Sequence, residues 1–446
     1  MANVLTQRTE GLLRRLVRRD ASNAIRKLLA KTRPEDLAAA MEHLTWAEQR
    51  RLHKLIDDLD YKATVIANLS EASILHLLQD ESEASVMDLL DRMEPDDATD
   101  VVEILPDALR SRVIEKLEGD EGVRELLEWD SDTAGGIMSP LVFKMPQTAT
   151  TGAAIAQLQK EHDALESVHY VYVVDGEDRL VGVTSLRSLL THAPDTPLIA
   201  LMSREVIQVG PRTDQEEVAR FVARYDLLAV PVVDNQGRIL GIVTVDDVLD
   251  VIRDEAAEDM MLMAGVSEGS GSTGPIAQTF RRAGWLMATT VGGILMAEII
   301  GTYKATLEAV AVLAGFIPVI MGMGGNVGIQ SATVAVRGLA TGHIQIGGAL
   351  RFVAQESQVG VLLGLLFAGL LGGYGALRFG VPIGASVALS VMLAISAASA
   401  IGAAIPVVLG RAGADPAIAT GPFVTTAVDM LAILIYFNIA RTLLGL

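Results

Sequence analysis

The sequence predicts a multi-domain protein in which an α-helical superhelical domain and an α/β pair precede an all-α membrane domain with five transmembrane helices. Three observations support this prediction. The chain has 446 residues and a net charge of −19, yet residues 276–446 hold only five acids and eight bases, so residues 1–275 carry −22. The second part contains several apolar stretches of about 20 residues or more, the length that crosses a bilayer. Repeated segments divide the first part into a helical region and a β-rich region.

Residues 1–135 are expected to form a helical domain with an internal repeat. The sequence Pro-Glu-Asp at 34–36 recurs as Pro-Asp-Asp at 95–97, and residues 71–90 resemble a third, looser copy. Helical repeats of this kind stack into a superhelix, in which each repeat packs on its neighbours. One interpretation is that the domain is only a scaffold, and the alternative is that its acidic side chains have a function of their own.

Residues 136–200 and 201–252 form two related units. Each begins with Met-Ser and continues with a helical stretch, a β-rich run, a turn that contains glycine, a second β-rich run and a helix. The strand–turn–strand segments read YVYVVDGEDRLVGVTSL and AVPVVDNQGRILGIVTV. These units resemble a tandem pair of CBS domains, which form pseudo-symmetric α/β modules that often hold adenine nucleotides.

The resemblance to CBS domains includes a nucleotide motif, Gly-x-x-Ser/Thr-x-x-Asp. Residues 241–247 contain it in full, whereas residues 182–188 end in Ser188 and lack the carboxylate that would bind ribose hydroxyls. The resemblance therefore implies that ATP, if it binds, is held by the second motif. A structural or dimerising module is the alternative. The candidate nucleotide ligands are Tyr170, Arg187, Thr244 and Asp247.

Residues 246–275 are expected to form an acidic connecting helix followed by a flexible glycine- and serine-rich link. Seven acids lie in the first 14 residues, and Asp247, Asp250, Asp254 and Glu258 share one helical face. Like charges at this spacing destabilise a helix unless cations neutralise them. A solvated acidic face is the alternative, but the number of acids on one face favours a divalent-cation site.

Residues 276–446 are expected to span the plasma (inner) membrane. The predicted spans lie near 283–302, 307–336, 352–377, 382–409 and 418–443. The first 20 residues are polar and basic and show no signal peptide, so the large N-terminal part is expected in the cytoplasm. Five spans then place the C-terminus outside, and the loop arginines agree with this orientation. The chain has no cysteine, which excludes disulfides and thiolate metal sites.

The last span, GPFVTTAVDMLAILIYFNIA, contains a single charged residue, Asp429. An ionisable group near the midplane costs about 2.5–3.5 kcal/mol on insertion scales and usually marks an ion path. Thr425 precedes it by one helical turn and presents a second oxygen on the same face. Because no span carries a central Lys or Arg that could pair with Asp429, an ion path is favoured over a structural role.

The second span carries the motif PVIMGMGGNVGIQ. Its proline and its glycines are expected to break the helix around Asn326, because unwound backbone at membrane depth lines cavities and offers carbonyl oxygens to ions. Close packing of small residues is the alternative, and both can hold together. All candidate donors are oxygens, which favours Mg²⁺, Ca²⁺ and Mn²⁺ over Zn²⁺ or Cu⁺. The candidate pore residues are Gly325, Asn326, Gly328, Thr425 and Asp429.

The order of the segments, together with the two membrane motifs, resembles the MgtE family of magnesium channels over essentially the whole chain. The resemblance implies a homodimer in the lipid bilayer, with a pore at the subunit interface lined by the second and fifth spans and centred on Asp429. It also implies that Mg²⁺ regulates the pore from the cytosolic domains. The implied regulatory ligands are Asp96, Asp100, Asp226, Asp247, Asp250, Glu255, Glu258, Asp259 and Glu356.

The predicted function is a Mg²⁺-selective channel that imports magnesium and closes when Mg²⁺ bridges the acidic cytosolic domains. One alternative is a divalent-cation transporter coupled to Na⁺ or H⁺. Another is a nucleotide-sensing regulatory protein whose membrane part is an anchor. The sequence shows no Ser/His/Asp or P-loop arrangement, so an enzyme is not expected, and nucleic acid is not an expected partner. The ranking of Mg²⁺ against Mn²⁺, Co²⁺ and Ca²⁺ stays open.

Overall fold

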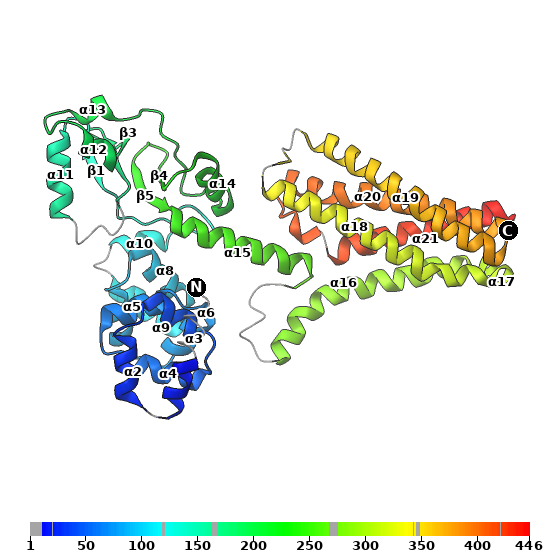
Figure 1. Ribbon diagram of the computed structural model, residues 1–446, viewed down its shortest axis with the longest axis horizontal. Helices are drawn as coiled ribbons and strands as arrows, with labels where there is room; N and C mark the ends of the chain where they lie inside the picture. The colour runs from blue at the N-terminus through cyan, green and yellow to red at the C-terminus, as the bar shows by residue number, and fades with distance from the viewer. Residues whose placement is uncertain are drawn as a thin grey trace. The chain divides into compact units, whose positions relative to one another are not determined.

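The chain folds into two compact units, residues 1–252 and 253–446 (Figure 1). The structure is a computed structural model. It describes residues 11–19, 21–117, 121–161, 168–266, 275–341, 343–344, 348–419 and 421–446. The predicted glycine- and serine-rich link falls mostly on residues 267–274, outside the described residues. The first unit holds the helical domain and the CBS pair, and the second holds the membrane helices.

The helical domain consists of short helices around one apolar core. The helices are α2 (Ser22–Leu29), α3 (Pro34–Met41), α4 (Trp46–Leu55), α5 (Leu59–Ala67), α6 (Glu71–Leu78), α7 (Glu83–Leu90), α8 (Pro95–Ile104), α9 (Asp107–Lys116) and α10 (Glu121–Leu126). The predicted repeat is confirmed, because α3 and α8 both start at the proline of the repeated segment. Proline suits this position because the first helical turn leaves its N–H groups unpaired.

The CBS pair contains two small sheets, and the predicted strand–turn–strand units are confirmed. The strands are β1 (Lys144–Pro146), β2 (Tyr170–Val174), β3 (Leu180–Ser185), β4 (Ala229–Val233) and β5 (Ile239–Thr244). Strands β2 and β3 are antiparallel, as are β4 and β5, and β1 runs parallel to β2. The helices of the pair are α11 (Thr151–Lys160), α12 (Leu186–Thr191), α13 (Leu198–Leu201) and α14 (Gln215–Tyr225).

The two β-turns of the CBS pair repeat the same chemistry. Asp175 and Asp234 each accept hydrogen bonds from two backbone N–H groups of their turn. Each also pairs with the arginine four residues later, at 2.9 Å for Arg179 and 2.8 Å for Arg238. The repeated turn agrees with the pseudo-symmetry that the sequence predicts. The acidic connecting segment then forms one continuous helix, α15 (Val245–Met263).

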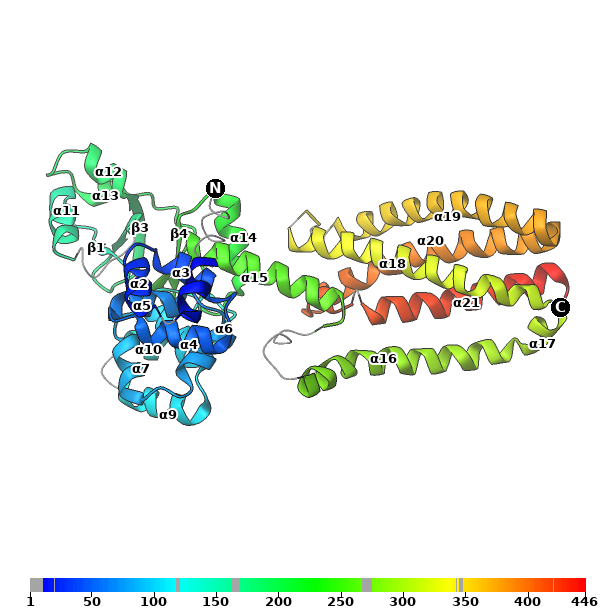
Figure 2. The ribbon, with the colours of Figure 1, turned by 60° about the horizontal axis from the view of Figure 1, so that its bottom comes forward.

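Within the described residues, the membrane part contains five helices long and apolar enough to cross a bilayer, as the sequence predicts. They are included in α16 (Pro275–Thr302), α18 (Ile317–Ala340), α19 (Ala349–Phe379), α20 (Val381–Arg411) and α21 (Pro422–Leu444). The short α17 (Lys304–Ala309) and a 3₁₀ helix (Ala311–Phe316) connect the first two. Helix α20 packs against α18, α19 and α21, and Figure 2 shows these four helices running side by side. Helix α16 packs against α21.

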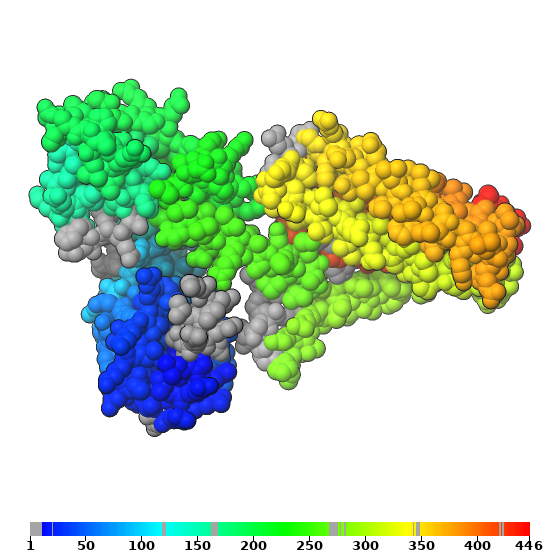
Figure 3. Space-filling view, viewed as in Figure 1, coloured from blue at the N-terminus to red at the C-terminus, as the bar shows by residue number. Residues whose placement is uncertain are grey.

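The predicted helix break around Asn326 is wrong, because α18 runs without interruption from Ile317 to Ala340. Pro318 lies in the first turn of this helix, where its missing N–H costs no hydrogen bond. The glycines serve close packing instead, since Gly324, Gly325 and Gly328 are buried against the neighbouring helices. In Figure 3 the atoms of α18, α19 and α20 form one continuous packed surface.

One backbone position of the first unit is strained and generates a stability prediction. Asp226 ends α14 in the left-handed conformation, with φ 51° and ψ 45°, a position that favours glycine. We expect Asp226→Gly to raise the free energy of unfolding of a fragment of residues 1–266 by about 1 kcal/mol, and Asp226→Ala to lower it. Thermal unfolding measures both changes. An alanine variant as stable as the glycine variant would contradict the assignment of strain.

Candidate ion-binding sites

Helices α18 and α21 meet where the candidate pore residues lie. A Cβ built on Gly325 would lie 3.3 Å from Asp429 Oδ1 and 3.4 Å from Thr425 Cγ2. A Cβ built on Gly328 would lie 3.1 Å from Val428 Cγ2. The glycines therefore allow α21 to approach α18 closely enough for the Asp429 carboxylate to face the backbone of α18. Of the predicted pore residues, the structure brings Gly325, Thr425 and Asp429 together.

The Asp429 carboxylate is incompletely satisfied. Its Oδ1 atom is buried and has no hydrogen-bond partner among the described residues. Thr425 Oγ1 donates to the main-chain oxygen of Gly421 at 3.2 Å, so its lone pairs stay available as acceptors. Asn326 is exposed on α18 beside Gly325. A buried carboxylate oxygen without a donor is costly unless water or a cation approaches it, which suits an ion path.

A first acidic cluster joins the helical domain to the start of α15. This α8 cluster consists of Asp96, Asp97 and Asp100 on α8 with Asp246 and Asp247 on α15. Burial, with Asp97 as the next cause, raises the pKa of Asp96 to about 6. Burial and then Asp97 and Asp96 raise the pKa of Asp100 to about 7, although Asp100 keeps an exposed surface. A cation or a proton would relieve this repulsion.

Asp247 serves its own helix as well as the cluster. Its Oδ2 atom accepts hydrogen bonds from the hydroxyl and the backbone N–H of Thr244, which fixes the start of α15. Burial still raises the pKa of Asp247 to about 6, and the charges of Asp96 and Asp246 act in the same direction. The residue that the sequence assigns to both nucleotide and Mg²⁺ therefore faces α8.

A second acidic cluster lies at the other end of α15. This α15 cluster consists of Glu255 and Asp259 with Asp415, which follows α20. Burial, then Asp415 and Glu255, raise the pKa of Asp259 to about 6. Sequence reasoning missed Asp415. The signal that could have found it is an acid in a short segment between two spans, close to the membrane end of an acidic helix.

Three further predicted regulatory acids are not among the residues that define these two clusters. Asp226 is exposed at the end of α14, Asp250 is exposed on α15 and Glu258 is half-buried on α15. Among the described residues, no three His, Asp or Glu side chains already stand close enough together to hold a metal ion. The clusters therefore bring carboxylates near one another without a finished coordination shell.

Glu356, predicted as a further regulatory ligand, takes part in a polar network between three membrane helices. Ser331 Oγ on α18 donates to Glu356 Oε2 at 3.0 Å. Ser399 Oγ on α20 donates to the main-chain oxygen of Glu356 at 2.7 Å, and the two hydroxyls are 2.9 Å apart. The carboxylate is thus directed at α18.

The nucleotide candidates are only partly brought together. The Leu228 N–H donates to Tyr170 Oη at 3.4 Å, and Leu228 in turn accepts from the Val245 N–H next to Thr244. Arg187 is exposed on α12. The crevice lined by Tyr170 has a volume of about 10 Å³, which holds one water at most. The crevice contains none of the other three candidates, and binding of ATP stays a prediction.

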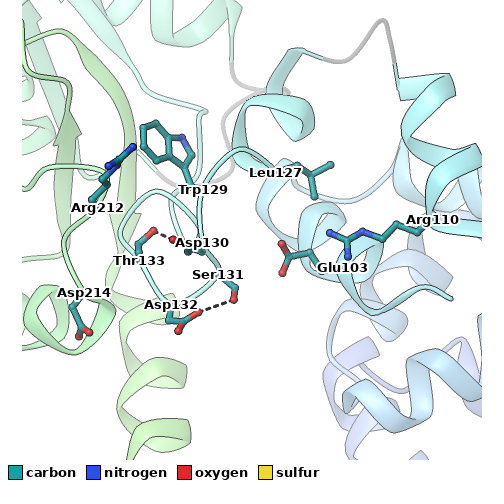
Figure 4. Close-up of a pocket in the computed structure, with 10 residues that line it drawn as sticks. All are labelled: Glu103, Arg110, Leu127, Trp129, Asp130, Ser131, Asp132, Thr133, Arg212 and Asp214. Atoms are coloured by element: carbon teal, nitrogen blue, oxygen red, sulfur yellow. Dashed lines mark hydrogen bonds between the residues drawn. The ribbon is translucent and has the colours of Figure 1, made fainter. Parts of the chain in front are cut away.

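A larger cleft of about 540 Å³ lies between the helical domain and the second CBS unit (Figure 4). Figure 4 shows Glu103 and Arg110 on one side and the loop 129–133 on the other. Burial raises the pKa of Glu103, whereas Arg110 lowers it. The cleft contains none of the predicted site residues. Sequence reasoning missed it because its lining comes from three separate segments.

Comparisons with known proteins agree with the domain order. A model of the MgtE divalent cation transporter matches residues 317–439, the MgtE intracellular N domain matches residues 32–132, and CBS domains match residues 134–195 and 198–254. The magnesium transporter MgtE of Thermus thermophilus is 34% identical over 449 residues, covering 95% of this chain and 96% of that protein. The magnesium transporter MgtE of Enterococcus faecalis is 38% identical over 319 residues, covering 71% and 70%.

A solved structure supports the same assignment for the first unit. The crystal structure of the soluble part of a magnesium transporter is 31% identical, with a TM-score of 0.50, and covers 56% of this chain and 99% of that structure. The similarity to complete relatives extends over both the soluble and the membrane part. The chain therefore belongs to the MgtE family of magnesium transporters.

Proposed function

We propose that the protein is a Mg²⁺ channel whose ion path passes Asp429. The observation that carries this proposal is the buried Oδ1 atom of Asp429, which has no partner among the described residues and faces Gly325. One carboxylate cannot replace the six waters of Mg²⁺, an ion that dehydrates reluctantly. The ion therefore passes with its waters. These waters form hydrogen bonds with the Thr425 hydroxyl, the Asn326 amide and the Asp429 carboxylate.

A homodimer completes this path. A second copy would add a second Asp429 across a two-fold axis and double the negative charge that attracts the ion. The N-terminal unit lies in the cytoplasm and the C-terminus outside, following the charges of the loops. A coupled transporter would need a Na⁺ or H⁺ gradient, whereas flux through a channel follows the Mg²⁺ gradient and the membrane potential alone.

Gating follows from the two acidic clusters. At low Mg²⁺ the carboxylates of each cluster repel one another, and burial adds to the cost of their charges. Bound Mg²⁺ would bridge α8 to the start of α15, and the end of α15 to the segment around Asp415. This fixes α15 and closes the path. Each ion favours the closed form only by its greater affinity for that form.

Loss of the pore carboxylate tests the ion path. We expect Asp429→Asn to lower Mg²⁺ flux about tenfold or more, because a divalent ion loses an attractive charge in a region of low dielectric constant. The measurement is uptake into liposomes that contain a Mg²⁺ dye, without Na⁺ or pH gradients. The control is Glu308→Gln, which neutralises a largely exposed acid on α17 and should leave the flux unchanged. Wild-type flux in the Asn variant excludes this ion path.

Neutralising one acid in each cluster tests the gate. We expect Asp100→Asn with Asp259→Asn to require more Mg²⁺ for closure. Two effects compete, since the change removes both repulsion and ligands. The ligand effect should prevail, because a bridging ion attracts carboxylates on two elements at once, whereas at low Mg²⁺ the acids with raised pKa can take up protons and so lessen their repulsion.

Patch-clamp current at increasing internal Mg²⁺ measures this change. The matched control is Glu71→Gln with Glu115→Gln, which removes two exposed acids of the N-terminal unit outside the clusters. If the control shifts the closing concentration as much as the cluster variant does, the effect belongs to net charge and the assigned ligands are wrong.

The raised pKa values generate a pH prediction for a fragment of residues 1–266. The ordinary pKa of Asp is 3.8, and those of Asp96, Asp100 and Asp247 are raised to about 6, 7 and 6. Between about pH 4 and 7 the folded form therefore binds protons that the unfolded form does not, so these acids make stability fall as the pH rises. Millimolar Mg²⁺ at pH 7.5 should restore the stability that is lost when these protons dissociate. Melting temperatures at pH 5 and pH 7.5, with and without Mg²⁺, measure this.

A variant separates this effect from an opposing histidine. Burial lowers the pKa of His53 to about 4 from 6.5, so His53 makes stability fall as the pH drops through this range. The double variant Asp96→Asn with Asp100→Asn keeps the contribution of His53 to the pH dependence of stability. It removes most of the contribution of the carboxylates. The difference between wild type and variant should be larger at pH 7.5 than at pH 5, with the variant the more stable at pH 7.5. Equal differences at both pH values would refute the prediction.

A further inference from the structure

Three membrane helices meet at a polar network centred on Glu356. Its side chain accepts a hydrogen bond from Ser331 of α18 at 3.0 Å, and its main-chain oxygen accepts one from Ser399 of α20 at 2.7 Å. Ser331 and Ser399 are 4% and 0% exposed. An ionisable side chain within a spanning helix needs a functional explanation. We propose that Glu356 is a positioning residue, which holds α18 so that its Gly325–Asn326 segment faces Asp429.

Helices α18, α19 and α20 are closely packed next to the network. A Cβ built on Gly360, one turn after Glu356, would lie 2.5 Å from Ser399 Cβ. A Cβ built on Gly402, one turn after Ser399, would collide with the main-chain oxygen of Gly328, one turn before Ser331. A close approach of α18, α19 and α20 therefore coincides with the network. Close packing sets the distance between the helices, and the hydrogen bonds select their register.

The network acts on the ion path through the length of α18. Ser331 follows Gly325 by six residues, which is about 9 Å along a continuous helix. Gly325 is the residue whose backbone faces Asp429 Oδ1. A change in the rotation or height of α18 at Ser331 is therefore transmitted to the Asp429 contact. This inference rests on the proposed ion path.

The network needs a side chain at residue 356 that forms hydrogen bonds, but this side chain does not need a negative charge. The network has three oxygen–oxygen contacts, at 2.7, 2.9 and 3.0 Å, but its two serine hydroxyls carry only two hydrogens. One contact therefore lacks a hydrogen when residue 356 is a carboxylate. A glutamine has the same shape and its amide can donate the third. A Mg²⁺ ligand would, in contrast, need the negative charge.

Substitution of Glu356 in the full-length protein separates these two roles. In Mg²⁺-dye liposomes we expect Glu356→Gln to keep the flux and Glu356→Ala to lose about tenfold or more, because the side-chain hydrogen bond that joins α19 to Ser331 of α18 is then lost. The Mg²⁺ concentration that closes the path should not move in the Gln variant. If Gln loses as much flux as Ala, or shifts the closing concentration as Asp100→Asn with Asp259→Asn does, Glu356 acts through its charge and the inference is overturned.

A double-mutant cycle tests the connection to α18 independently of transport. Because the Glu356 side chain and Ser331 share one hydrogen bond, the losses of melting temperature in detergent for Glu356→Ala and Ser331→Ala should be less than additive in the double variant. Ser357→Ala is the control, since the Ser357 hydroxyl donates to Val353 of its own helix at 2.7 Å, and its effect should add to that of Glu356→Ala. If the wild type carries no Mg²⁺, the proposed function fails and this cycle still decides the inference. Additive losses for Glu356 and Ser331 overturn it.

Discussion

Repulsion between carboxylates is the constraint that governs the contact between α8 and the start of α15. Burial and neighbouring acids raise the pKa of Asp96, Asp100 and Asp247 together, so the folded form holds these charges at a cost. The Thr244 hydroxyl binds one carboxylate and keeps α15 in place, but it leaves the repulsion across to α8. Protons or divalent ions are the species that can lower this cost. A higher concentration of a cation that binds the cluster would therefore stabilise the form in which α8 and α15 are in contact.

Small residues play the corresponding role in the membrane part. Gly325 and Gly328 allow α21 to lie against α18, and this contact directs the Asp429 carboxylate to the backbone of α18. The helix is intact at these glycines. The space that their absent side chains leave is filled by side chains of α21, and no backbone is unwound. In a bilayer, where lipid gives no hydrophobic force between helices, such close contacts and the hydrogen bonds of Glu356 specify how the helices fit together.

The sequence predicts the segments better than the contacts between them. Apolar length, the Pro-Glu-Asp repeat and the paired strand–turn–strand units are local signals, and the structure has the corresponding helices and strands. The state of α18 was mispredicted because proline and glycine break an isolated helix, whereas packing on α20 and α21 stabilises this one. Neither the cluster partner Asp415 nor the hydrogen bond between Glu356 and Ser331 is found from the sequence, because the partners lie more than 20 residues apart in the sequence.

The position of the two clusters on one helix has a consequence for gating. Asp247 and Asp259 are twelve residues apart, about 18 Å along α15. Each cluster includes a partner that does not belong to α15, namely α8 at one end and Asp415 at the other. Under the proposed gating, an ion that binds at one end restrains the helix and lowers the entropy that the second ion must remove. The two sites then bind cooperatively with no contact between them, and by reciprocity a proton or Mg²⁺ at the α8 cluster strengthens Mg²⁺ binding at Asp259. Under the proposed gating, the continuous helix α15 would thus give a steeper response to Mg²⁺ than either site alone.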